Sequence, residues 1–122
     1  MESANVIYGL GQFFDVAASA VTPVFFTRQS AGLWTANSNM AFTPNTSVAP
    51  QFIGALNACN FVAVIESLSF FSIIQSHDCG STWAQQQQVN NQSIAGAMLF
   101  SSALGVANYN NTGLAFASIP LQ

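Results

Sequence analysis

The sequence predicts an all-α fold, in which an N-terminal amphipathic helix precedes a hydrophobic antiparallel helical hairpin. Three observations lead to this prediction. Apolar residues recur at helical spacing near the N-terminus, residues 51–76 are apolar almost all round, and a capping-box pattern begins at Thr82. With 122 residues, of which 51% are hydrophobic, the chain is long enough to bury a core, and we expect residues 1–122 to form one domain.

The first helix is predicted over residues 4–22. Its apolar residues recur every three or four positions, while polar residues form the opposite stripe. The apolar positions are Val6, Leu10, Phe13, Phe14, Ala17 and Val21. Pro23 removes a backbone donor and restricts the residue before it, so the helix is expected to end there. Residues 23–49 are predicted to be a long loop whose large apolar groups pack on the parent fold or on a neighbouring subunit.

The helical hairpin is predicted from residues 50–76 and 82–108, joined by a turn at residues 77–81. Pro50 suits the first turn of a helix, and the segment after it has few polar residues. Such a helix is buried in a core, an assembly or a membrane, and at about 1.5 Å per residue it would span roughly 39 Å. The apolar tail, residues 109–122, is expected to lie along another subunit.

Charge is scarce in this chain. It has four acidic residues and one basic residue, Arg28, whereas an ordinary soluble domain has about 25% charged residues. The surface must therefore be neutral, or be covered by lipid or by other copies of the chain. Phosphate contacts are made chiefly by clustered Lys and Arg, so a stand-alone nucleic-acid binder is not expected. Arg28 is the candidate nucleic-acid contact of a polymer, or the partner of a carboxylate.

Two carboxylates, Asp15 and Glu66, lie in the predicted apolar helices. In a bilayer they would suggest a proton or ion path. Outside a bilayer we expect them to be hydrogen-bonded to neighbouring Ser and Asn residues, or paired with Arg28.

The only histidine lies in the sequence His77-Asp78-Cys79. Nucleophile and base normally come from separate elements with a pocket between them, so we expect a polar turn here and no enzyme. Closed structural zinc sites need four Cys or His ligands, and the chain has two Cys and one His. No metal and no cofactor are therefore predicted.

The predicted helices keep the two cysteines apart. Cys59 would lie roughly 25 Å from Cys79, whereas the Cα atoms of a disulfide lie within about 7 Å. We therefore expect Cys59 to be a buried free thiol, with a bond between Cys79 residues of two chains as the alternative. An intrachain disulfide would contradict the helical hairpin.

Three N-glycosylation sequons begin at Asn45, Asn91 and Asn110. Each is a candidate acceptor if the chain meets a glycosylation system, and chance occurrence in a chain rich in Asn and Ser is the alternative.

The layout of residues 51–108 resembles the hydrophobic helical-hairpin major coat proteins of rod-shaped and spindle-shaped archaeal viruses. The resemblance implies a virion in which many copies form a helical shell around double-stranded DNA. The predicted function is therefore a structural subunit that self-assembles through apolar surfaces. The candidate interface residues are Leu68, Phe70, Phe71, Ile73, Ile74, Trp34 and Phe116.

Two alternatives remain open. A small integral membrane protein would use residues 52–74 as its span, since about 20 apolar residues suffice, although the flanking Lys and Arg residues that set orientation are missing. Such a protein would have a membrane location and lipid as its partner. An extracellular pilus-like filament subunit is the other alternative, and it shares the self-assembly of the first prediction.

Overall fold

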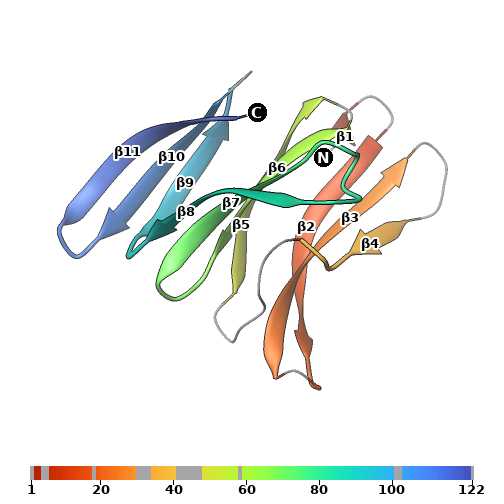
Figure 1. The fold of residues 1–122 in the computed structure, drawn as a ribbon, viewed down its shortest axis with the longest axis horizontal. Helices are drawn as coiled ribbons and strands as arrows, with labels where there is room; N and C mark the ends of the chain where they lie inside the picture. The colour runs from red at the N-terminus through yellow and green to blue at the C-terminus, as the bar shows by residue number, and fades with distance from the viewer. Residues whose placement is uncertain are drawn as a thin grey trace.

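The computed structural model contains strands where the sequence predicted helices, so the all-α prediction is wrong. The structure describes residues 2–3, 6–17, 19–29, 34–40, 48–57, 59–100 and 103–121. These residues include no helix, and their eleven strands form three antiparallel sheets arranged as successive layers (Figure 1). Within the same ranges, no helix is therefore available that could cross a membrane.

Each sheet is an antiparallel meander. The first sheet consists of β1 (Glu2–Ser3), β2 (Val6–Asp15), β3 (Ala20–Gln29) and β4 (Thr35–Asn37). The central sheet consists of β5 (Ala49–Asn57), β6 (Asn60–Glu66), β7 (Phe70–Ser76) and β8 (Ala84–Asn90). The third sheet consists of β9 (Ser93–Leu99), β10 (Ala103–Asn110) and β11 (Gly113–Pro120), with β10 in the middle. Since strand neighbours are also sequence neighbours, local hairpins build all three layers.

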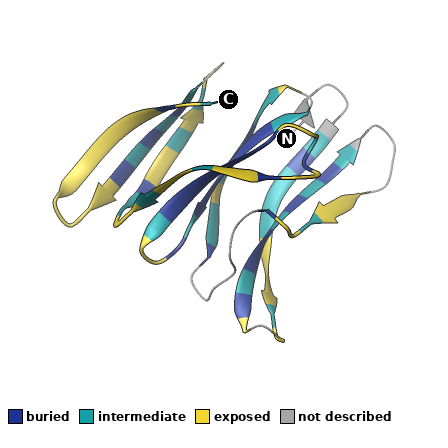
Figure 2. Ribbon diagram, in the orientation of Figure 1, coloured by how far each residue is buried: buried dark blue, intermediate teal, exposed yellow. Residues whose placement is uncertain are grey.

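The two middle strands of the central sheet, β6 and β7, are buried on both faces (Figure 2). On β6, Phe61, Ala63 and Ile65 pack toward the first sheet, while Val62 and Val64 pack toward the third sheet. Successive side chains of a strand point to opposite faces, so a strand covered on both sides is apolar at every position. This explains why the segment predicted as one buried helix, residues 50–76, is three strands.

The predicted N-terminal helix is instead the hairpin of β2 and β3. Leu10 pairs with Phe25 and Phe14 with Val21, so the apolar residues are brought together across two strands. The ring of Phe26 lies over Gly9, where an added Cβ would be 2.6 Å from the ring. The predicted loop, residues 23–49, therefore contains most of β3 and all of β4.

The other half of the predicted hairpin and the tail are also strands. Residues 82–108 contain β8, β9 and most of β10, and the tail residues 109–122 contain β11. Thr82 does not cap a helix, because its backbone N–H and its hydroxyl both donate to the carboxylate of Asp78. With no helical hairpin over residues 51–108, the resemblance to the archaeal-virus coat proteins is wrong.

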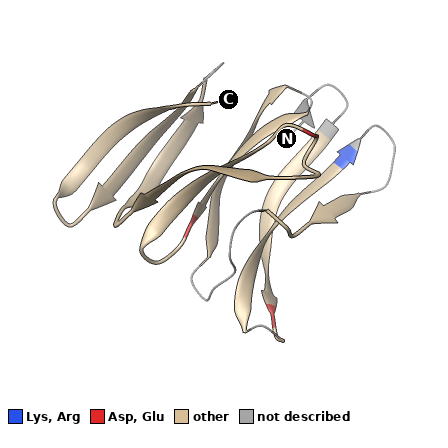
Figure 3. Ribbon diagram, in the orientation of Figure 1, with Lys and Arg blue, Asp and Glu red and all other residues tan. Residues whose placement is uncertain are grey.

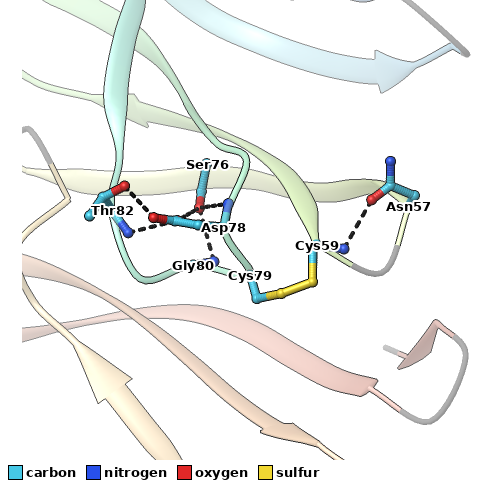
Figure 4. The surroundings of a disulfide bond; sticks show 7 residues. All are labelled: Asn57, Cys59, Ser76, Asp78, Cys79, Gly80 and Thr82. Carbon is cyan, nitrogen blue, oxygen red and sulfur yellow. Dashed lines mark hydrogen bonds between the residues drawn. A yellow bond between two sulfur atoms is a disulfide. The ribbon is translucent and has the colours of Figure 1, made fainter.

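A disulfide joins Cys59 to Cys79, so the prediction of a free Cys59 thiol is wrong (Figure 4). Cys59 directly precedes β6 and Cys79 follows β7, and the antiparallel pairing of these strands brings their open ends together. The backbone N–H of Cys79 donates to the carbonyl of Cys59 at 3.0 Å. Next to this bond, Gly80 has φ of +90° and lies against the ring of Phe25, where a side chain would collide.

Candidate functional site

The outward face of the third sheet is an exposed apolar surface that all three of its strands build. Leu104, Val106 and Ile119 point inward and pack on the central sheet. The strand register places the intervening residues, Tyr109 among them, on the outside, where four large side chains are more than half exposed. These are Met98, Phe100, Leu114 and Phe116, which are 61%, 52%, 60% and 77% exposed. We call this surface the outer face of the third sheet.

Small residues form the floor of a shallow groove on this face. Gly96 pairs with Ala107, and Gly105 pairs with Met98, so the centre of the face carries little side-chain volume. The groove has a volume of about 330 Å³ and is flanked by Met98 and by the ring of Phe100, which lies over Gly105. This face therefore combines large apolar side chains with a shallow groove, and apolar composition is typical of the core of a protein interface.

No charged residue follows Asp78 in the sequence, so the third sheet carries no formal charge. Its three strands are tan along their whole length in Figure 3. An apolar surface without charge binds other apolar surfaces and offers nothing to an ionic ligand.

The first sheet lies at the opposite end of the stack from the third sheet (Figure 1), and it carries a second exposed apolar surface. Phe25 points inward from β3, so its neighbour Phe26 points outward from the first sheet. The ring of Phe26 lies 5.9 Å from the ring of Trp34, centroid to centroid, and Trp34 is 51% exposed. Gly9 pairs with Phe26, and Phe13 lies four residues after Gly9 on β2, so Phe13 is on the same outward face. Phe13, Phe26 and Trp34 make up what we call the outer face of the first sheet.

No family model matches this chain, and no curated protein or solved structure matches it.

The predicted interface residues fall into two groups. Leu68, Trp34 and Phe116 are exposed, and Phe70 is half-buried. Phe71, Ile73 and Ile74 are fully buried inside the chain's own core, so they are not accessible to a second copy. Leu114 lies in the tail that was predicted to lie along another subunit, whereas Met98 and Phe100 were not among the predicted interface residues. The signal for Leu114 was the Asn-Asn-Thr-Gly turn at residues 110–113, which is followed by alternating large and small apolar residues on one strand.

The structure keeps the remaining candidate residues apart from these two faces. Arg28 pairs with Ile7 in the first sheet, is half-buried and already makes an interaction within the chain. Asn91 and Asn110 are exposed at turns, and Asn45 lies outside the described residues.

Both carboxylates that were predicted to lie in apolar helices accept hydrogen bonds within the chain. Glu66 accepts a hydrogen bond from the backbone N–H of Ile94 at 2.8 Å, which ties the central sheet to the third sheet. Its other oxygen lies 3.4 Å from the side-chain amide of Gln51. Asp15 accepts from the backbone N–H of Ala17 at 3.0 Å.

The His77-Asp78-Cys79 sequence forms a turn that is held by the disulfide and by hydrogen bonds to Asp78. The carboxylate of Asp78 accepts hydrogen bonds from Thr82 and Ser76, and these lower its pKa to about 2. Cys79 is in the disulfide and offers no thiol. Within the part of the chain that the structure describes, no three His, Cys, Asp or Glu residues are grouped as metal ligands would be.

Proposed function

We propose that this protein is a structural subunit that polymerises by stacking its sheets. The outer face of the third sheet of one copy packs on the outer face of the first sheet of the next copy. The observation that carries this proposal is the presence of two exposed apolar surfaces at opposite ends of the three-sheet stack.

The area of the third-sheet face supports a stable contact. A buried aromatic side chain covers roughly 150–250 Å², so the four large side chains of this face, each more than half exposed, present roughly 450 Å². A similar area on the partner would bring the interface to roughly 900 Å² before the small residues of the groove are counted, just under the ~1,000 Å² at which specific interfaces begin.

The arrangement of the two faces favours an open polymer. When a surface packs on a different surface of the next copy, the contact repeats without limit unless the rotation closes a ring. Low charge also removes the repulsion between like-charged copies that keeps ordinary proteins apart.

Two single substitutions test the proposal by analytical ultracentrifugation. Phe116→Ser damages the third-sheet face and Trp34→Ser damages the first-sheet face, while Val16→Ser, at an 80% exposed turn position, is the control. We expect the wild type and the control to form large species and each of the other two variants to be monomeric. An equal mixture of the two monomeric variants retains one intact pair of faces, so it should form 1:1 dimers and nothing larger.

Two results would contradict this scheme. Dimers of Trp34→Ser alone would show that the third-sheet face binds itself, which is a closed contact. A wild type that stays monomeric at high concentration would overturn self-association altogether.

The cargo and location predicted from the sequence stay predictions. A virion shell around double-stranded DNA has Arg28 as its candidate contact, and particles of Arg28→Ala that still package full-length DNA would contradict that role. The pilus-like filament belongs to the same class of polymer. Recovery of the native protein in a membrane fraction that detergent dissolves would instead indicate a membrane location with lipid partners.

A further inference from the structure

Three chain connections meet at one end of the central and third sheets and line a cleft of about 310 Å³. They are the β6–β7 turn, the crossing from β8 to β9 and the β10–β11 turn. The lining residues are Leu68, Ser69, Asn91, Gln92, Ser93, Tyr109, Asn110 and Asn111. The volume is at the lower end of the range for small-molecule pockets, which begins at about 300 Å³.

Hydrogen bonds fix the three connections relative to one another. The backbone N–H of Asn91, which has φ of +59°, donates to the carbonyl of Ser69 at 2.6 Å. The side-chain amide of Asn108 donates to Gln92 at 2.9 Å, which anchors the crossing to β10. Asn110 closes its own turn by accepting from the backbone N–H of Thr112 at 2.8 Å. The cleft is therefore held in shape before any ligand enters.

The chemistry of the lining is neutral. It consists of amides and hydroxyls, each able to donate and accept, together with the 46% exposed ring of Tyr109 and the exposed side chain of Leu68. The nearby carboxylate of Glu66 is occupied by the backbone N–H of Ile94 and by Gln51. An anionic ligand would meet no cation in this lining, and a cationic ligand would meet no carboxylate.

A neutral sugar matches this lining better than a charged ligand does. Its hydroxyl groups donate and accept like the amides, and the C–H face of a pyranose ring can lie on an aromatic ring. We propose that this cleft binds a neutral carbohydrate, with Tyr109 stacking on the sugar ring and Asn91, Gln92 and Asn111 binding its hydroxyl groups. Two of the three sequons, at Asn91 and Asn110, open onto the same cleft, so protein made without N-glycosylation is the form to test.

Isothermal titration calorimetry of the full chain, produced in a bacterium that lacks N-glycosylation, tests the proposal. The probes are maltose, cellobiose, lactose and N,N′-diacetylchitobiose. We expect at least one to bind, and we expect Tyr109→Ala and Asn111→Ala each to weaken that binding by about tenfold. Tyr109→Phe keeps the ring and should stay within about threefold of wild type. Gln87→Ala, at an exposed position on β8, is the control and should bind as wild type.

Asn111→Ala keeps the test informative if Tyr109→Ala misfolds. Asn111 is exposed in a turn, and its side chain makes no hydrogen bond to any described residue. The proposal is overturned if none of the four sugars binds at ten-millimolar concentration, or if binding survives both alanine substitutions unchanged. It is also overturned if a sulfated disaccharide binds more tightly than every neutral one. Phe116→Ser should disrupt the stacking of copies and leave the cleft intact. Measuring sugar binding by this variant therefore distinguishes a failure of the carbohydrate proposal from a failure of the stacking proposal.

Discussion

Removal of the disulfide should destabilise the protein by a predictable amount. Cys59 and Cys79 are 20 residues apart in sequence, and closing a loop of that length removes about 3 kcal/mol of chain entropy from the unfolded state. The bond lies at the open end of the β6–β7 hairpin, where backbone pairing already holds the two residues in place. Its contribution should therefore come mainly from the unfolded state.

Urea unfolding of the double variant Cys59→Ala/Cys79→Ala measures this effect. With a slope of about 1.5 kcal/mol/M, a loss of about 3 kcal/mol lowers the midpoint by about 2 M. The tryptophan fluorescence signal is suitable because Trp83 is buried, with its ring 5.1 Å from that of Phe25. Wild-type protein unfolded in the presence of reductant should match the double variant.

Two findings would refute this reasoning. If the oxidised wild type and the double variant unfold at the same urea concentration, the loop-closure argument fails. If mass spectrometry of the native protein finds both cysteines free, the disulfide is absent and cannot supply this stability.

Three further predictions concern single positions. Gly80→Ala should cost about 1–3 kcal/mol, because φ is +90° and a buried phenylalanine ring lies against the glycine, whereas Gly96→Ala, with nothing within 4 Å, should be close to neutral; equal urea midpoints would contradict this. Ile73→Asp should prevent folding because it buries a charge, while Leu68→Asp, at an 84% exposed position, should fold normally, as circular dichroism can check. The carboxylate of Asp78 has its pKa lowered to about 2, so the stability it contributes is present above about pH 4 and lost as pH falls toward 2. Asp78→Asn should make the melting temperature nearly independent of pH over that range. If the variant keeps the pH dependence of the wild type, the turn does not depend on the ionised carboxylate.

The sequence located the buried core but not its geometry. Residues 50–76 were predicted to be buried in a core, an assembly or a membrane, and the structure buries residues 61–65 and 71–74 in the chain's own core, so Phe71, Ile73 and Ile74 are not the interface residues that the sequence predicted. Burial on both faces removes the polar alternation that marks a strand, so periodicity cannot distinguish such a strand from a buried helix. The interruption at residues 67–69 separates two short apolar runs rich in β-branched and aromatic residues, which is typical of strands.

The N-terminal error has a different cause. Val6, Leu10, Phe13 and Phe14 already fall at helical spacing within β2, and Ala17 and Val21 continue the pattern through the turn into β3. Gly9 and Gly11 are poor helix formers at alternate positions, and both accommodate the ring of Phe26. These two glycines, at alternate positions of an apolar segment, are therefore the sequence feature that indicated a strand at residues where the apolar spacing indicated a helix.

The cleft could not be predicted from the sequence at all. Its residues come from three connections that are far apart in the chain, and each looks like an ordinary polar turn. Only the meander of the central sheet and the crossing from β8 to β9 bring Ser69, Asn91 and Tyr109 to one place. By contrast, the scarcity of charge was visible in the composition and led to the same class of function under either fold.

Scarce charge has a direct consequence for strand β11. It is the edge of the third sheet, eight residues long, and all of its residues except Ile119 are exposed. Natural proteins protect such edges with charged side chains, with bulges or with a covering segment, because an open edge can pair with another chain. Strand β11 has no charge, and Pro120 blocks hydrogen bonding only at its end. An isolated subunit therefore leaves unprotected the edge and the face that a polymer would cover, which is why we interpret the missing charge as an adaptation to assembly.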